Sequence, residues 1–259
     1  MSYRDILVFL DATSDTPVRL ELAVTLARQH GARLLGVDVS TPSAFDGQWK
    51  DSAAGLQDLF LSQLDRAGLN GEFRIADRDT GAWKALYAHF ADLVIATQRH
   101  ETNADLVLPA VPEEVLLSAG VPVLILPPGW RPRPVGKTIV LAWNASREAT
   151  RAAHDALPLL SRAEKVVLFE FAPQADRLDS APRLMADHLR RHGVEVESFT
   201  WPDAGDSSPV DALFACLDQE DADLIVSGAF GHSPMAEALL GGVSRDLIRN
   251  VSMPILMSH

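Results

Sequence analysis

Short apolar runs alternate with segments of helical periodicity along the chain. Residues 6–10 form an unbroken apolar run, which is typical of a strand buried on both faces. Apolar residues then recur at helical spacing from Leu20 to Ala27, until Gly31 ends the helix. Further strands are predicted at residues 33–39, 72–76, 93–96 and 121–126, and further helices at 56–67 and 83–90. Strands that alternate with helices predict an α/β fold with a doubly wound parallel sheet.

A proline-rich stretch then interrupts the pattern. Four prolines fall within residues 127–134, and prolines at this density stiffen a linker. We therefore expect a linker at residues 129–135 between two domains, residues 1–128 and 136–259. Two domains also suit a chain of 259 residues.

After the linker the pattern starts again. Residues 138–146 read Thr-Ile-Val-Leu-Ala-Trp-Asn-Ala-Ser and parallel residues 5–13, so that Ile139 repeats Ile6 at a distance of 133 positions. Near the end, Pro254 repeats Pro122 at a distance of 132. The second half is predicted to contain strands at 165–172, 194–201, 224–226 and 254–257, and helices at 149–160, 183–192 and 208–217. A repeat of this length indicates that a whole domain was duplicated.

Helix caps are predicted at two places. Asp15 or Thr16 would cap the first helix, and Ser207 or Ser208 the helix at 208–217, because their side chains can accept hydrogen bonds from the first backbone N–H groups.

Composition narrows the classes of function. A net charge of −12 argues against broad nucleic-acid or anionic-membrane binding, because both need a basic face. Cys216 is the only cysteine, so no intrachain disulfide can form, and its apolar surroundings predict a buried structural thiol. The sequence shows no signal-peptide pattern and no apolar run of membrane-spanning length, so we expect a cytoplasmic location.

A glycine-spaced segment follows the strand predicted at 224–226. Two residues separate its first two glycines, and nine separate the second from the third. Small residues let backbone N–H groups approach a ligand, and a helix opening near the end of the segment would add its positive dipole end. The segment lacks the Gly-Lys-Ser/Thr of a Walker loop, and its third glycine comes too late for a dinucleotide fingerprint. The residues concerned are Gly228, Gly231, Gly241, Gly242, Val243 and Ser244.

This spacing resembles the nucleotide loop of the universal stress protein family. The family pattern continues with Gly-Ser or Gly-Thr, where this chain has Gly242 and then Ser244 two positions on. Residues 253–257, Met-Pro-Ile-Leu-Met, resemble the family's last strand. With the repeat, nearly the whole chain resembles two universal stress protein domains in tandem. The resemblance implies an adenine-nucleotide α-hydrolase-like fold, with five parallel strands in the order 3-2-1-4-5 in each domain.

The two halves differ at the expected site. With an offset of 132, Gly228 corresponds to Ala96, and Gly241 corresponds to Pro109. Proline has no N–H group, so the first half is not expected to hold a phosphate chain by this route. Asp11 and Asn144 both follow a first strand, at the edge where open α/β sheets bind ligands. Family members that bind ATP usually have Asp there, which only the first half retains.

The resemblance implies ATP or AMP binding in the second half, with Mg²⁺ as an accompanying ion. Asn144 and Ala145 would contact the nucleoside. The phosphates would be held by Gly228, Gly231, His232, Gly241, Gly242, Val243 and Ser244. The implied role is that of a stress-response regulator or signalling module, with at most slow ATP hydrolysis, because no residue stands out as a general base.

Two alternatives to nucleotide binding stay open. The glycine segment could be a turn that binds nothing, which would leave an interaction scaffold with degenerate pockets in both halves. A metabolic enzyme is the other alternative, for which no second-substrate chemistry is visible. The histidines show no distinctive metal-ligand spacing, and Trp83, Trp143 and Trp201 are interpreted as packing residues. We also expect the two halves to pair through their last strands, and a homodimer is a further option.

Overall fold

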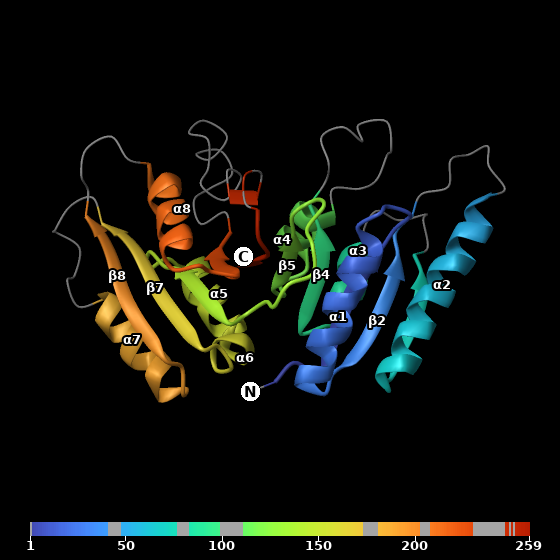
Figure 1. The fold of residues 1–259 in the computed structure, drawn as a ribbon, viewed down its shortest axis with the longest axis horizontal. Helices are drawn as coiled ribbons and strands as arrows, with labels where there is room; N and C mark the ends of the chain where they lie inside the picture. The colour runs from blue at the N-terminus through green and yellow to red at the C-terminus, as the bar shows by residue number, and fades with distance from the viewer. Residues whose placement is uncertain are drawn as a thin grey trace. The chain divides into compact units, whose positions relative to one another are not determined.

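The computed structural model describes residues 2–40, 48–76, 83–98, 111–172, 181–202, 208–229, 247–248, 250 and 252–259. The chain divides into two compact units, Met1–Pro132 and Arg133–His259. The division falls inside the stretch predicted to be a linker, residues 129–135. Each unit is described by itself below (Figure 1).

The first unit contains a parallel sheet in the strand order β3-β2-β1-β4-β5. Its strands are β1 (Asp5–Leu10), β2 (Arg33–Asp38), β3 (Gly71–Ile75), β4 (Leu93–Thr97) and β5 (Val123–Leu126). Its helices are α1 (Thr16–His30), α2 (Gln48–Ala67), α3 (Trp83–Ala88) and α4 (Val111–Ser118). Helix α1 packs on α2, and α3 packs on α4. Right-handed crossovers place these two pairs on opposite faces of the sheet.

The second unit repeats this topology, with the strand order β8-β7-β6-β9-β10. Its strands are β6 (Thr138–Ala142), β7 (Lys165–Ala172), β8 (Val196–Pro202), β9 (Leu224–Gly228) and β10 (Ile255–Ser258). Its helices are α5 (Arg147–Asp155), α6 (Leu157–Leu160), α7 (Ala181–Arg191) and α8 (Pro209–Gln219). The predicted fold, two doubly wound sheets with the order 3-2-1-4-5, is confirmed.

The apolar runs form the centre of each sheet. Ile6, Leu7 and Val8 in β1 are fully buried, as are Ile139 and Val140 in β6. Helices on both faces leave no side of these strands in water, which is why the strands are continuously apolar rather than alternating. Cys216 is buried as predicted, and burial raises the pKa of its thiol to about 11, with a further contribution from Glu220.

One aspartate anchors the first strand in each unit. The Oδ2 atom of Asp92 accepts hydrogen bonds from the backbone N–H groups of Arg4 (2.6 Å) and Asp5 (3.0 Å). Asp223 does the same for Gly136 (2.6 Å) and Lys137 (3.1 Å) just before β6. The two aspartates are 131 positions apart, so the repeat offset at the fourth strand is 131 and not 132.

The strand register confirms this offset. Ile6 pairs with Leu93 in the first unit, and Ile139 pairs with Leu224 in the second. Gly228 therefore corresponds to Thr97, and the assignment of Gly228 to Ala96 was wrong. An insertion or deletion between repeats shifts the offset locally, and Ala-Asp-Leu at residues 91–93 and 222–224 shows the same offset of 131 in the sequence.

Two local predictions were also wrong, and one was right. Asp15 occupies the cap position of α1, but its side chain makes no cap; its Oδ1 accepts a hydrogen bond from Gly129 N instead. The helix predicted at 149–160 is divided into α5 and α6, because Pro158 has no N–H group to continue the hydrogen-bond ladder. Ser208 caps α8 as predicted, accepting from Asp211 N at 3.1 Å.

Within the described ranges, no helix is long and apolar enough to cross a membrane.

Candidate functional site

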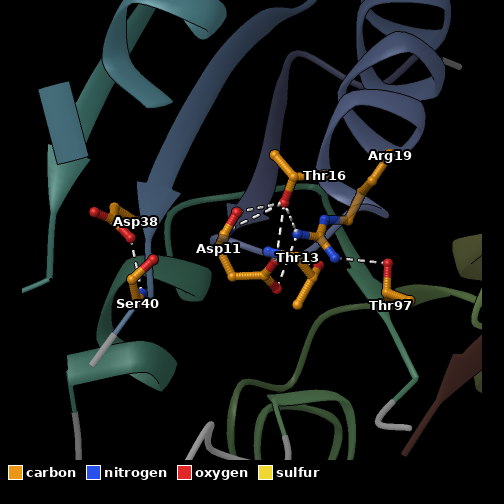
Figure 2. Close-up of polar contacts among 7 residues, drawn as sticks. All are labelled: Asp11, Thr13, Thr16, Arg19, Asp38, Ser40 and Thr97. Atoms are coloured by element: carbon orange, nitrogen blue, oxygen red, sulfur yellow. Dashed lines mark hydrogen bonds and ion pairs between the residues drawn. The ribbon is translucent and has the colours of Figure 1, made fainter. Parts of the chain in front are cut away.

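The carboxyl edge of the first sheet contains a buried ion pair. Asp11 follows β1 directly, and Arg19 reaches it from the second turn of α1 (Figure 2). The Arg19 Nη2 atom lies 3.1 Å from the Asp11 Oδ2 atom, and the arginine side chain is only 2% exposed. The protein therefore uses the carboxylate that the family resemblance assigned to ligand binding for a contact with its own guanidinium group.

Three threonines complete this cluster. The Arg19 guanidinium donates from Nη1 to Thr97 Oγ1 (2.6 Å) and from Nη2 to Thr16 Oγ1 (2.7 Å). Thr16 Oγ1 in turn lies 2.8 Å from the carbonyl oxygen of Asp11, and the backbone N–H of Thr13 donates to Asp11 Oδ1 (3.0 Å). Charge-assisted hydrogen bonds of this kind stabilise a buried ion pair that would otherwise be costly.

The electrostatics of Asp11 follow from these contacts. Burial alone would raise the pKa of its carboxyl group. The Arg19 charge and the hydrogen bonds from Thr13 and Thr16 outweigh burial and hold the pKa below its ordinary value. Asp11 is therefore ionised at neutral pH and paired.

The second unit has small or neutral residues at every corresponding position. The residues of the first unit correspond to residues of the second unit at an offset of 133 along the first strand and helix, and at an offset of 131 at the fourth strand. The positions of Asp11, Thr13, Thr16, Arg19 and Thr97 are taken by Asn144, Ser146, Ala149, Ala152 and Gly228. The internal ion pair is thus absent at these positions, because neither charge is encoded there.

Asn144 and Ala145 form a tight turn at this edge. The Asn144 side-chain oxygen accepts a hydrogen bond from Ser146 N at 3.1 Å, and Ser146 Oγ caps α5 by accepting from Ala149 N at 3.1 Å. Ala145 has a φ of 59°, a left-handed conformation that costs a non-glycine residue about 1–2 kcal/mol. Strained residues of this kind concentrate at functional sites, and both Asn144 and Ala145 are exposed.

Gly228 lies against the first turn of α5. A Cβ atom added to it would be 2.5 Å from Ala149 N and 2.6 Å from the carbonyl carbon of Glu148. Because both groups belong to the backbone, they cannot rotate away. The absence of a side chain at Gly228 therefore sets the distance between α5 and β9, whatever ligand the edge binds.

We expect Gly228→Ala to lower the free energy of unfolding by about 1–3 kcal/mol, the usual cost of forcing extra volume into a packed interior. Gly55→Ala is the matched control, since no atom lies within 4 Å of its added Cβ in α2. That control should stabilise the protein by about 0.5–1 kcal/mol, because alanine is the better helix former. Urea titration of both variants measures the two effects. If Gly228→Ala leaves the free energy of unfolding unchanged or raises it, the packing argument is refuted.

An acidic residue also lies at the same register position on the second strand of each sheet. Asp38 at the end of β2 is 2% exposed, and its Oδ1 accepts a hydrogen bond from Ser40 N at 2.8 Å (Figure 2). By strand register, Glu170 takes the same place on β7. Burial raises the pKa of Glu170. Neither Asp38 nor Glu170 was predicted from the sequence to be a site residue.

The structure describes only part of the predicted site. It brings Asn144, Ala145 and Gly228 to the same edge of the second sheet, at the ends of β6 and β9. The remaining residues of the predicted phosphate loop lie outside the described residues: Gly231, His232, Gly241, Gly242, Val243 and Ser244.

Arg19 and Thr97 are the site residues that the sequence analysis missed. One signal was available, since Arg19 lies four and eight positions before Ala23 and Ala27 and so on the apolar face of its helix. A charged residue on such a face needs a buried partner.

Comparison with known proteins supports the fold and the repeat. The sequence model of the universal stress protein family matches residues 203–259. The universal stress protein Rv1636 of Mycobacterium tuberculosis is 26% identical over 140 residues, which cover 48% of this chain and 96% of that protein. The match to one such protein along half of the chain agrees with the duplication inferred above.

Two solved structures align with almost the entire chain. A universal stress protein from Archaeoglobus fulgidus covers 98% of this chain and 95% of its own, with a TM-score of 0.75 and 18% identity. A putative universal stress protein from Pseudomonas aeruginosa covers 99% and 93%, with a TM-score of 0.65 and 18% identity. At this identity the likeness establishes the fold. The chain therefore has the two-domain fold of these universal stress proteins, and its last part, residues 203–259, matches the sequence model of the universal stress protein family.

Proposed function

We propose that the second unit binds an adenine nucleotide, ATP or AMP, and that the protein acts as a nucleotide-responsive regulator or signalling module in the stress response. The contrast between the two sheet edges carries this proposal. In the first unit, Arg19 forms an ion pair with the Asp11 carboxylate. In the second unit, Asn144 and Gly228 stand at the corresponding positions, and no internal cation is encoded there. Ligands of open α/β sheets bind at this edge.

The residues of the second edge suit a nucleoside and a phosphate chain. Asn144 uses one lone pair of its amide oxygen for Ser146 N, and its remaining donors and acceptor can contact ribose or base together with the exposed Ala145. Backbone N–H groups would hold the phosphates, with Mg²⁺ as an accompanying ion. These groups belong to Gly228, Gly231, His232, Gly241, Gly242, Val243 and Ser244.

The proposed nucleotide acts as a signal rather than as a substrate. Asn144 stands where family members that bind ATP usually have Asp, and an amide cannot serve as a general base. We therefore expect at most slow hydrolysis of bound ATP. Pairing of the two units through β5 and β10, and a homodimer, remain predictions.

A scaffold that binds no nucleotide is the second candidate. One observation favours it: the first unit has already replaced a ligand contact with its own Asp11–Arg19 pair. In this alternative the edge of the second sheet has also lost nucleotide binding, and the protein acts by binding other molecules through its surface.

Mass spectrometry of the denatured, purified protein tests the proposal. We expect co-purified ATP or AMP at close to one molecule per chain, and an increase in Tm when ATP is added to nucleotide-free protein, because a ligand that binds only the native state stabilises it. Absence of both a co-purified nucleotide and an ATP-dependent thermal shift would favour the scaffold.

A further inference from the structure

Two helices of the second unit bring three histidines together at the surface. His154 lies in the last turn of α5, His188 in the last turn of α7, and His192 four residues further on. The Nε2 atoms of His154 and His188 are 3.0 Å apart. The ring of His192 packs edge-on against that of His188, with 4.7 Å between centroids. None of these residues belongs to the edge proposed to bind the nucleotide.

The distance between the two Nε2 atoms suits two ligands of one metal ion. Zinc–nitrogen bonds of about 2.0–2.1 Å place two imidazole nitrogens about 3.3 Å apart in tetrahedral geometry and about 2.9 Å apart at a right angle. The observed 3.0 Å lies between these values. The two nitrogens share a hydrogen bond in which one ring donates its N–H to the other, and a metal ion would take the place of that proton. The rings meet at 82°.

We propose that His154 and His188 form a surface site for a late first-row divalent cation, of which Zn²⁺ is the representative. Among the described residues, no group of three or more His, Cys, Asp or Glu side chains is arranged to hold a metal. The proposed site has two protein ligands, His154 and His188, and water completes the coordination. Imidazole nitrogen is a poor ligand for hard cations, so Mg²⁺ is not expected to bind at this site.

Calorimetric titration of the untagged full chain, treated with a chelator and free of nucleotide, tests the proposal. We expect Zn²⁺ to bind at about one ion per chain, with the imidazole NMR signals of His154 and His188 shifting together, and no such response to Mg²⁺. His154→Ala and His188→Ala should each weaken Zn²⁺ binding at least about tenfold, since losing even an outer-shell partner of a metal ligand costs 10–100-fold.

His89→Ala is the control, since His89 is an exposed histidine of the first unit. It should leave the Zn²⁺ affinity unchanged. His154→Gln serves as a second variant if His154→Ala alters the circular dichroism spectrum. The proposal is overturned if Zn²⁺ produces no binding heat, or if it binds equally well to the His154 and His188 variants.

Discussion

Arg19→Ala is expected to lower the free energy of unfolding of the first unit by about 3–5 kcal/mol, because it leaves the Asp11 carboxylate buried without its counter-ion. The arginine side chain is 2% exposed and that of Asp11 16% exposed, so solvent screens the pair only weakly. Thr97 and Thr16 also lose their charged donor. Urea denaturation followed by circular dichroism measures the loss, and hydrogen exchange of β1 and β4 localises it to the first unit.

An exposed arginine provides the matched control. Arg33 pairs with Asp5 at 3.0 Å, with side chains 51% and 43% exposed. Arg33→Ala should cost no more than about 1 kcal/mol, the usual value for a surface ion pair. The double variant Asp11→Leu/Arg19→Met should recover most of the loss, because it leaves neither charge unpaired. Equal effects of Arg19→Ala and Arg33→Ala would show that the buried pair contributes no more than a surface one.

The ion pair also predicts how stability depends on pH. The pKa of Asp11 is lower in the folded protein than its unfolded value of about 3.9. Its contribution is therefore fully present above the unfolded pKa and is lost as the pH falls through the folded pKa. The stability difference between the wild type and Arg19→Ala should be constant from pH 6 to 8 and should shrink below about pH 4. A difference that stays constant down to pH 2 would contradict the pairing.

Gly241→Val is expected to weaken nucleotide binding by about two orders of magnitude or more while leaving the fold intact. In the proposed loop a side chain would enter the space that a phosphate needs, and it would penalise any positive φ at this position. Loss of two or three backbone hydrogen bonds to a charged phosphate, at about 1.5–3 kcal/mol each, accounts for the size of the effect. Calorimetric titration with ATP and Mg²⁺ measures the affinity.

Pro109→Val is the control for this prediction, because Pro109 lies in the segment after the fourth strand of the first half, which lacks the glycine spacing. It should leave the ATP affinity unchanged. Circular dichroism verifies that both variants are folded. An unchanged affinity in folded Gly241→Val would move the phosphate site away from the glycine loop, while leaving nucleotide binding elsewhere in the chain open.

The sequence determined the architecture because burial imposes a pattern that is visible in one dimension. Strands covered on both faces must be continuously apolar, so apolar runs such as residues 6–10 identified the sheet. A similar run near residue 139 identified the second unit. The glycine spacing from Gly228 onward and the final strand were sufficient to recognise the family.

The tertiary structure decided which groups meet at each edge, because those contacts join residues far apart in the sequence. Arg19 and Thr97 are 78 positions apart, and no local pattern predicts that Arg19 donates to Thr97 while it pairs with Asp11. His154 and His188 come together only because the fold brings the last turn of α5 near the last turn of α7.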